Sequence, residues 1–196
     1  DALSEGSDRQ GILVLDCTSP RVYAVGNITE KAERVQEMYR KEGKDIAVVT
    51  YTGSGISVKY PREKWSKMKG ERARMDTTIE DIDEKCGLCM PVFVFAFSKM
   101  RRGISYRSSH RVPTHLVIML GRGHNAMNVV QAMGRGTFNG KSVLESNGHS
   151  YVTVLTMGRD YLMAKEMQKC IVEVFQWVKA CLVDTSDAAD QRRCEE

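Results

Sequence analysis

The chain has 196 residues, 42% of them hydrophobic, and a formal net charge of +4. This length suits one folded domain, and the apolar content is enough for a buried core. No run of about 18 apolar residues is present, which excludes a membrane-spanning helix. The mild positive charge permits a nucleic-acid surface without arguing for one.

Apolar runs of strand length alternate with helical patterns along the chain. In chain order, the pattern predicts strand 11–16, helix 28–42, strand 46–51, strand 91–97, strand 115–120, helix 125–133, strand 151–156 and helix 160–183. The strands are almost continuously apolar, which indicates burial on both faces. We therefore expect an α/β fold in which helices cover a mostly parallel sheet of about five or more strands.

The two ends of the chain and one internal segment differ from this pattern. We expect an N-terminal extension at 1–10, the folded domain at 11–183, and a flexible polar tail at 184–196. Segment 61–84 is highly charged and offers little to bury, so we expect a partly helical surface excursion there. The first residues show neither a signal-peptide pattern nor an initial Met. We therefore expect a fragment of an intracellular protein, from the nucleus or the cytoplasm.

The six cysteines form no recognisable metal or disulfide framework. Cys86 and Cys89 make a lone C-x-x-C, which lacks the second pair of ligands that a zinc site needs. This pair also precedes a predicted strand, whereas a redox C-x-x-C opens a helix after a strand. We expect reduced thiols and no metal site. The four histidines belong to no nucleophile elbow or metal signature, so hydrolase chemistry of that kind is not expected.

Two glycine-rich segments resemble nucleotide-binding loops without meeting their requirements. Segment 136–142 ends in Gly140-Lys-Ser, but the first glycine of a P-loop would have to stand where Arg135 is. The segment also follows a predicted helix instead of a strand. Residues 121–126, Gly-Arg-Gly-His-Asn-Ala, follow a strand and open a helix, as a dinucleotide fingerprint does. No acidic residue ends the next strand to hold a ribose, so a Rossmann-type site is the weaker alternative.

A third set of segments is informative through its order along the chain. Residues 131–135, Gln-Ala-Met-Gly-Arg, end a predicted helix, and residues 102–105, Arg-Gly-Ile-Ser, follow an apolar strand. These segments resemble motifs VI and V of superfamily 2 helicases and translocases. Strand 11–16 with its helix resembles the motif IV region, and residues 50–55 resemble the short motif that touches the nucleic-acid backbone. The succession covers roughly residues 10–160.

This resemblance implies the second, C-terminal RecA-like domain of an ATP-dependent helicase, a three-layer fold of the P-loop NTPase class. It implies that Arg135 is catalytic and neutralises charge on the γ-phosphate. The implied nucleotide-binding residues are Gln131, Gly134, Arg135, Gly103 and Ser105. The implied contacts with DNA or RNA phosphates come from Thr52, Gly53, Ser54, Ser98, Arg101 and Arg102. ATP and Mg²⁺ would be bound mainly by the N-terminal RecA-like domain of the same parent chain, so this chain alone should be inactive.

The sequence departs from the family pattern at three positions. Motif VI usually carries a second arginine, commonly the arginine finger, where this chain has Phe138. Motif V has a threonine in many members where Phe97 stands, and often an aspartate where Ser105 stands. Three states therefore remain open: a divergent motor, a motor that only binds ATP, and a non-catalytic nucleic-acid-binding or scaffold module.

Overall fold

The computed structural model describes residues 9–18, 28–96, 104–119, 126–134 and 140–193. The strands in these ranges are β1 (Leu13–Asp16), β2 (Ala47–Thr52), β3 (Gly55–Lys59), β4 (Ser66–Lys67), β5 (Val92–Phe95), β6 (His115–Ile118) and β7 (Thr153–Thr156). The α-helices are α1 (Ile28–Lys41), α2 (Met75–Cys86), α3 (Ala126–Met133), α4 (Lys141–Ser146) and α5 (Gly158–Arg193), and a 3₁₀ turn, η1 (Gly70–Ala73), precedes α2.

The strands form one sheet in the order β4-β3-β2-β5-β1-β6-β7. The neighbouring strands β2, β5, β1, β6 and β7 are parallel. β3 is antiparallel to β2, and β4 is antiparallel to β3. The prediction of a mostly parallel sheet with five or more strands is therefore confirmed. β1 lies at the centre of the parallel part, where Leu15 pairs with Val94 of β5 and with Leu116 of β6.

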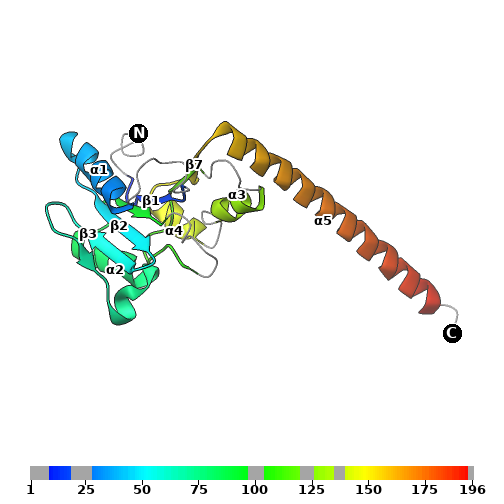
Figure 1. Cartoon of the computed structure of the whole chain (residues 1–196). Helices are drawn as coiled ribbons and strands as arrows, with labels where there is room; N and C mark the ends of the chain where they lie inside the picture. Colours follow the sequence, from blue (N-terminus) through cyan, green and yellow to red (C-terminus); the bar gives the residue numbers. More distant parts are fainter. Residues whose placement is uncertain (1–8, 19–27, 97–103, 120–125, 135–139, 194–196) are drawn as a thin grey trace.

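Alternate residues of the central strand pack on opposite faces of the sheet. Val14 lies in a buried cluster with Ala32 of α1. Leu13 and Leu15 lie in a second cluster, which contains Ile79 of α2 together with residues of α3 and of the start of α5. Helices thus cover both faces of the sheet, which is compatible with a three-layer α/β fold (Figure 1).

Segment 61–84 is more deeply involved in the core than its charge suggested. Met75, Ile79 and Ile82 of α2 are at most 3% exposed. Their spacing of four and three residues places them on one face of the helix. The prediction that this segment has little to bury is wrong, because the charged residues between these three conceal a short apolar stripe.

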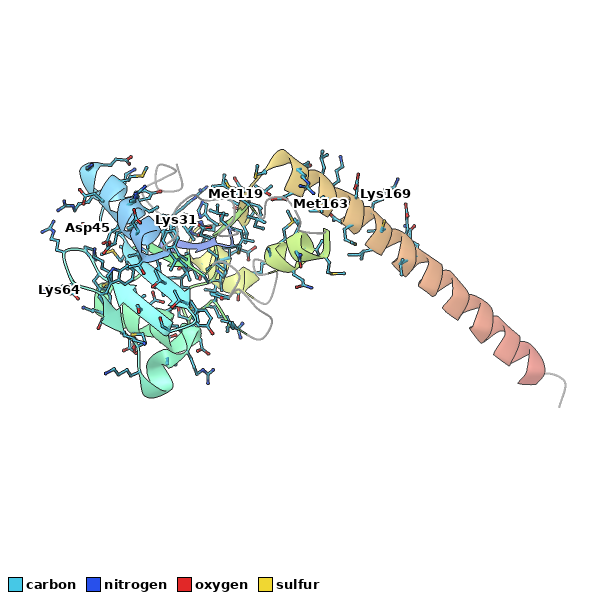
Figure 2. The ribbon with its side chains drawn as sticks, viewed as in Figure 1. Lys31, Asp45, Lys64, Met119, Met163 and Lys169 are labelled. Carbon is cyan, nitrogen blue, oxygen red and sulfur yellow. The ribbon has the colours of Figure 1, made fainter. Side chains whose placement is uncertain are left out.

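Other elements were also not predicted. β3 and β4 add an antiparallel extension to the sheet, and α4 begins at Lys141, at the end of the segment that resembles a P-loop. Helix α5 continues past the predicted end at residue 183 to Arg193, and it projects away from the sheet (Figures 1 and 2). Among the helices that the structure describes, none combines the length and the apolar character needed to cross a membrane.

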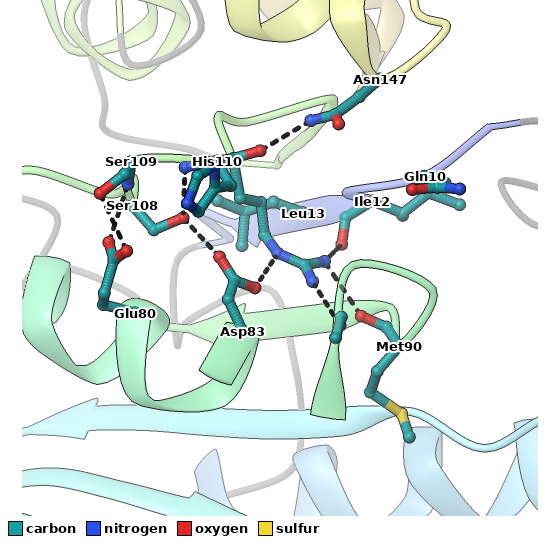
Figure 3. Close-up of polar contacts among 12 residues, drawn as sticks. Gln10, Ile12, Leu13, Glu80, Asp83, Met90, Ser108, Ser109, His110 and Asn147 are labelled. Carbon is teal, nitrogen blue, oxygen red and sulfur yellow. Dashed lines mark hydrogen bonds and ion pairs between the residues drawn. The ribbon is translucent and has the colours of Figure 1, made fainter. Parts of the chain in front are cut away.

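A buried arginine ties together the amino ends of the central strands (Figure 3). Arg111 Nε donates to Asp83 Oδ1 of α2 at 2.7 Å, and neither side chain is more than 5% exposed. Its Nη1 donates to the carbonyl oxygens of Ile12 at 2.7 Å and Met90 at 3.0 Å, and Nη2 donates to the carbonyl oxygen of Gly87 at 3.3 Å. Because Ile12 and Met90 precede β1 and β5, one side chain fixes the start of both strands against α2.

We predict that Arg111→Ala lowers the free energy of unfolding by about 3–5 kcal/mol, because it leaves the Asp83 carboxylate buried without its cation. Equilibrium denaturation in urea measures the change. Arg74→Ala is the matched control, since Arg74 is an exposed arginine paired with Asp76, and its midpoint should barely move. Equal midpoints for the Arg111 and Arg74 variants would contradict the structural role given to Arg111.

Candidate functional site at the carboxyl edge of the sheet

The parallel strands end together along one edge of the sheet. β1 ends at Asp16, and its neighbours β5 and β6 end at Phe95 and Ile118. In open α/β sheets, ligands bind outside the carboxyl ends of strands, where the strand order reverses. β5 and β6 stand on either side of β1, so the segments that follow them leave the sheet two strand spacings apart, about 9.5 Å.

The predicted nucleic-acid contacts at residues 52–54 lie on this edge. They form the tight turn between β2 and β3, and Gly55 closes the turn with a φ of 109° that favours glycine. The Thr52 and Ser54 hydroxyls are 2.7 Å apart, and the Ser54 N–H donates to Thr52 Oγ1 at 3.2 Å. The turn therefore orders its own hydroxyls, and Ser54 is exposed. The other predicted contacts, Ser98, Arg101 and Arg102, lie outside the described residues.

The predicted nucleotide-binding residues are described in part. Gln131 is exposed in the last turn of α3, and the Gly134 N–H donates to the Val130 carbonyl at 2.8 Å as that helix ends. Ser105 is half-buried in the segment that leads from β5 to β6. Gly103 and the catalytic candidate Arg135 lie outside the described residues. The structure thus places Gln131 and Gly134 downstream of β6 and Ser105 downstream of β5.

An ion pair at the end of β1 was missed by the sequence analysis. Lys31 of α1 pairs with Asp16, and the two side chains are only 12% and 8% exposed. The Lys31 ammonium also lies 5.5 Å from the centre of the Phe95 ring. The second Asp16 oxygen accepts the Thr18 N–H at 2.9 Å, and the buried Thr18 hydroxyl has no hydrogen-bond partner. The signal in the sequence for this ion pair was an aspartate, Asp16, at the end of an apolar strand.

Two adjoining hollows open beside Ser105. The larger, of about 690 Å³, lies between the start of α2, the segment that leads to β6, and α4; its lining includes Arg74, Thr77, Ser105, Arg107 and Ser109. The smaller, of about 200 Å³, reaches Tyr51 near the end of β2. Both are lined by Arg74, Asp76 and Ser105. Together, the two hollows therefore run from near the end of β2, past Ser105, to α4.

The charged side chains that line the larger hollow differ in their hydrogen-bond and ion-pair partners. Asp76 accepts two hydrogen bonds from Arg74, at 3.1 and 2.7 Å, and these bonds lower the pKa of the Asp76 carboxyl. Glu80 accepts the Ser109 N–H and hydroxyl, both at 2.8 Å. Arg107 is exposed and forms no ion pair with any described residue. Arg107 is therefore the cation in this hollow that is available to an anionic ligand.

The structure describes no built site for a metal or for nucleotide phosphates. No group of three or more His, Cys, Asp or Glu side chains could hold a metal among the residues that were placed. Gly140 caps α4, and Lys141 is 81% exposed with its ammonium 3.6 Å from Glu145. This arrangement is the start of a surface helix, and residues 136–139 of the segment that resembles a P-loop lie outside the described residues. The Rossmann-like segment lies almost entirely outside the described residues.

Comparison with protein-family models, with curated proteins and with solved structures finds no significant match. The resemblance to superfamily 2 helicases therefore stays a prediction, which rests on the motif segments and on the strands that they follow.

We predict that the purified chain hydrolyses ATP no faster than buffer, because Lys141 is 81% exposed and the sequence has Arg135 where the first glycine of a phosphate loop would stand. A coupled ATPase assay on the chain and on Lys141→Ala should give the same background rate for both. Turnover that Lys141→Ala abolishes would contradict the rejection of this P-loop.

Proposed function

We propose that this chain is the second RecA-like domain of an ATP-dependent superfamily 2 helicase or translocase. The observation that carries the proposal is the position of β1 between β5 and β6. The segment similar to motif V follows β5, and the segment similar to motif VI follows β6 and α3. The chain therefore leaves the same edge of the sheet toward both segments, on the two sides of the central strand: directly from β5 to the first, and from β6 by way of α3 to the second. One ATP cleft could use both.

In this proposal the nucleotide lies between two domains. The N-terminal RecA-like domain of the parent chain binds most of the ATP and Mg²⁺. This chain contributes Arg135, whose charge stabilises the γ-phosphate in the transition state. Gln131 lies in the last turn of the helix that precedes Arg135, and Gly134 follows that helix. Gly103 and Ser105 belong to the sequence segment after β5.

The proposed nucleic-acid track follows the other part of the same edge. Thr52 and Ser54 offer hydroxyls in an ordered turn, and Arg107 offers a free cation in the adjoining hollow. Ser98, Arg101 and Arg102 belong to the segment between β5 and Ser105 and complete the set. Hydroxyls, backbone N–H groups and arginines of this kind bind phosphates without reading bases, so we expect weak, sequence-independent binding.

A non-catalytic nucleic-acid-binding or scaffold module is the second candidate. Phe138 favours it, because this residue stands where the family commonly has its arginine finger. Such a module would still bind nucleic acid through the proposed track, but Arg135 would no longer stabilise the γ-phosphate of ATP. A Rossmann-type site has less support, because β7 and the turn after it end in Thr156-Met157-Gly158 without an acid for a ribose.

We predict that the chain binds a labelled single-stranded oligonucleotide and that Arg107→Ala weakens this binding. Each phosphate contact on a single strand contributes about 0.7 to the slope of log affinity against log salt, so that slope should become shallower by about this amount. Fluorescence anisotropy over a salt series measures both quantities. Changing Arg101 and Arg102 to Ala together should have a larger effect of the same kind.

Arg62→Ala is the matched control, because Arg62 is 80% exposed and lies beside Asp45, at the amino edge of β2. It should leave the affinity and the salt slope as they are in the unchanged chain. Affinity that does not respond to salt, or an equal loss for the Arg62 and Arg107 variants, would contradict a phosphate track at the carboxyl edge.

A further inference from the structure

β7 forms one edge of the sheet that the structure describes, and side chains on both of its faces are partly exposed. Of the strands that the structure describes, only β6 pairs with it. Val154 and Leu155 point to opposite faces, and they are 39% and 53% exposed. Parallel strands in α/β proteins are normally buried on both faces, so an apolar strand exposed on both sides is an unfinished edge.

The chain on both sides of β7 adds to this apolar surface. Four more large hydrophobic side chains close to the strand are exposed, namely Tyr151, Met157, Tyr161 and Leu162. No charged residue occurs from Ser150 to Gly158. Thr156 also has a buried hydroxyl with no hydrogen-bond partner. Solvent-exposed edges usually carry charges or proline that prevent pairing, and this edge carries neither.

The opposite edge of the same sheet is protected. β4 has only two residues, one of them Lys67, and Lys64 and Lys69 lie close by in the sequence. A very short, lysine-rich edge strand resists pairing with another chain. The molecule therefore blocks one edge and leaves the other open, so association through the open edge stops at two copies instead of growing into a fibre.

The backbone of β7 offers a strand-shaped partner site. The Thr153 N–H donates to the Thr114 carbonyl on the β6 side at 2.9 Å. In a parallel ladder, alternate residues then face away, so the amides of Val152, Val154 and Thr156 point outward. A two-fold axis at Val154 places each of these outward residues opposite an outward residue of an identical strand. No like charges meet in this arrangement.

We propose that β7 pairs antiparallel with β7 of a second copy of this chain, joining two sheets about a two-fold axis. Val154 then packs against Val154 of the copy on one face of the strand, and on the other face Leu155 lies opposite Thr153 of the copy. This interface is independent of the helicase proposal, because it uses the free edge and not the carboxyl edge of the sheet.

Sedimentation velocity of the purified chain over a dilution series tests the pairing. We expect a dimer that dissociates on dilution. Val154→Pro removes an outward N–H without taking a hydrogen bond from β6, and Leu155→Lys places a charge in the interface. Each should give a monomer whose circular dichroism and thermal unfolding match the unchanged chain. If Val154→Pro fails to fold, Leu155→Lys alone decides.

Val172→Lys is the matched control, because Val172 is 47% exposed on the projecting part of α5, away from β7. It should remain a dimer. A monomer at every concentration would overturn the proposal and leave the edge to a different partner. Loss of the dimer in Val172→Lys, with the dimer kept in Leu155→Lys, would also overturn it by placing the contact on α5.

Discussion

The buried pair of Arg111 and Asp83 is the interaction on which the order of the central strands depends. Burial lowers the pKa of Arg111 from its ordinary value, and the negative charge of Asp83 opposes that shift. A guanidinium is tolerated in a core only when its donors are satisfied, and here Asp83 and three carbonyl oxygens accept them. The side chain thereby holds the end of α2, the starts of β1 and β5, and the segment that leads into β6 in one fixed relation.

This constraint gives the two edges of the sheet different roles. At the amino edge, polar groups are paired within the fold, as in the bonds of Asn147 to the His110 carbonyl and of His149 to the Gln10 carbonyl. At the carboxyl edge the turn at 52–54 is exposed, and the hollows beside Ser105 begin near it. The larger hollow holds Arg107, which is exposed and forms no ion pair with any described residue. Binding of phosphates requires exposed polar groups held in fixed positions, and loops on a rigid sheet meet this requirement.

The sequence predicted the parallel strands and most of the helices because apolar runs and helical spacing can be recognised from the local sequence alone. It missed the burial of α2, whose segment it predicted to be a partly helical surface excursion, because Met75, Ile79 and Ile82 are separated by charged residues. It missed the two-residue β4 because so short a strand has no pattern. The sequence did not single out Arg111, since only the fold reveals the groups that accept its hydrogen bonds. Thr52 and Ser54 lie at the turn that follows β2, as the apolar run before them indicates, and their contact with nucleic acid stays a prediction. The Asp16–Lys31 pair and the position of Arg107 in the hollow depend on contacts between different segments of the chain.

The central claim, that this chain completes an ATP cleft, is tested most directly at Arg135 in the parent protein that includes the partner domain. ATP turnover of Arg135→Ala should fall by at least about a hundredfold in kcat, with a smaller change in KM, because the charge acts mainly in the transition state. Arg135→Lys should recover little, since an ammonium lacks the planar fork of a guanidinium. A folded Arg135→Ala protein with unchanged kcat would contradict the account.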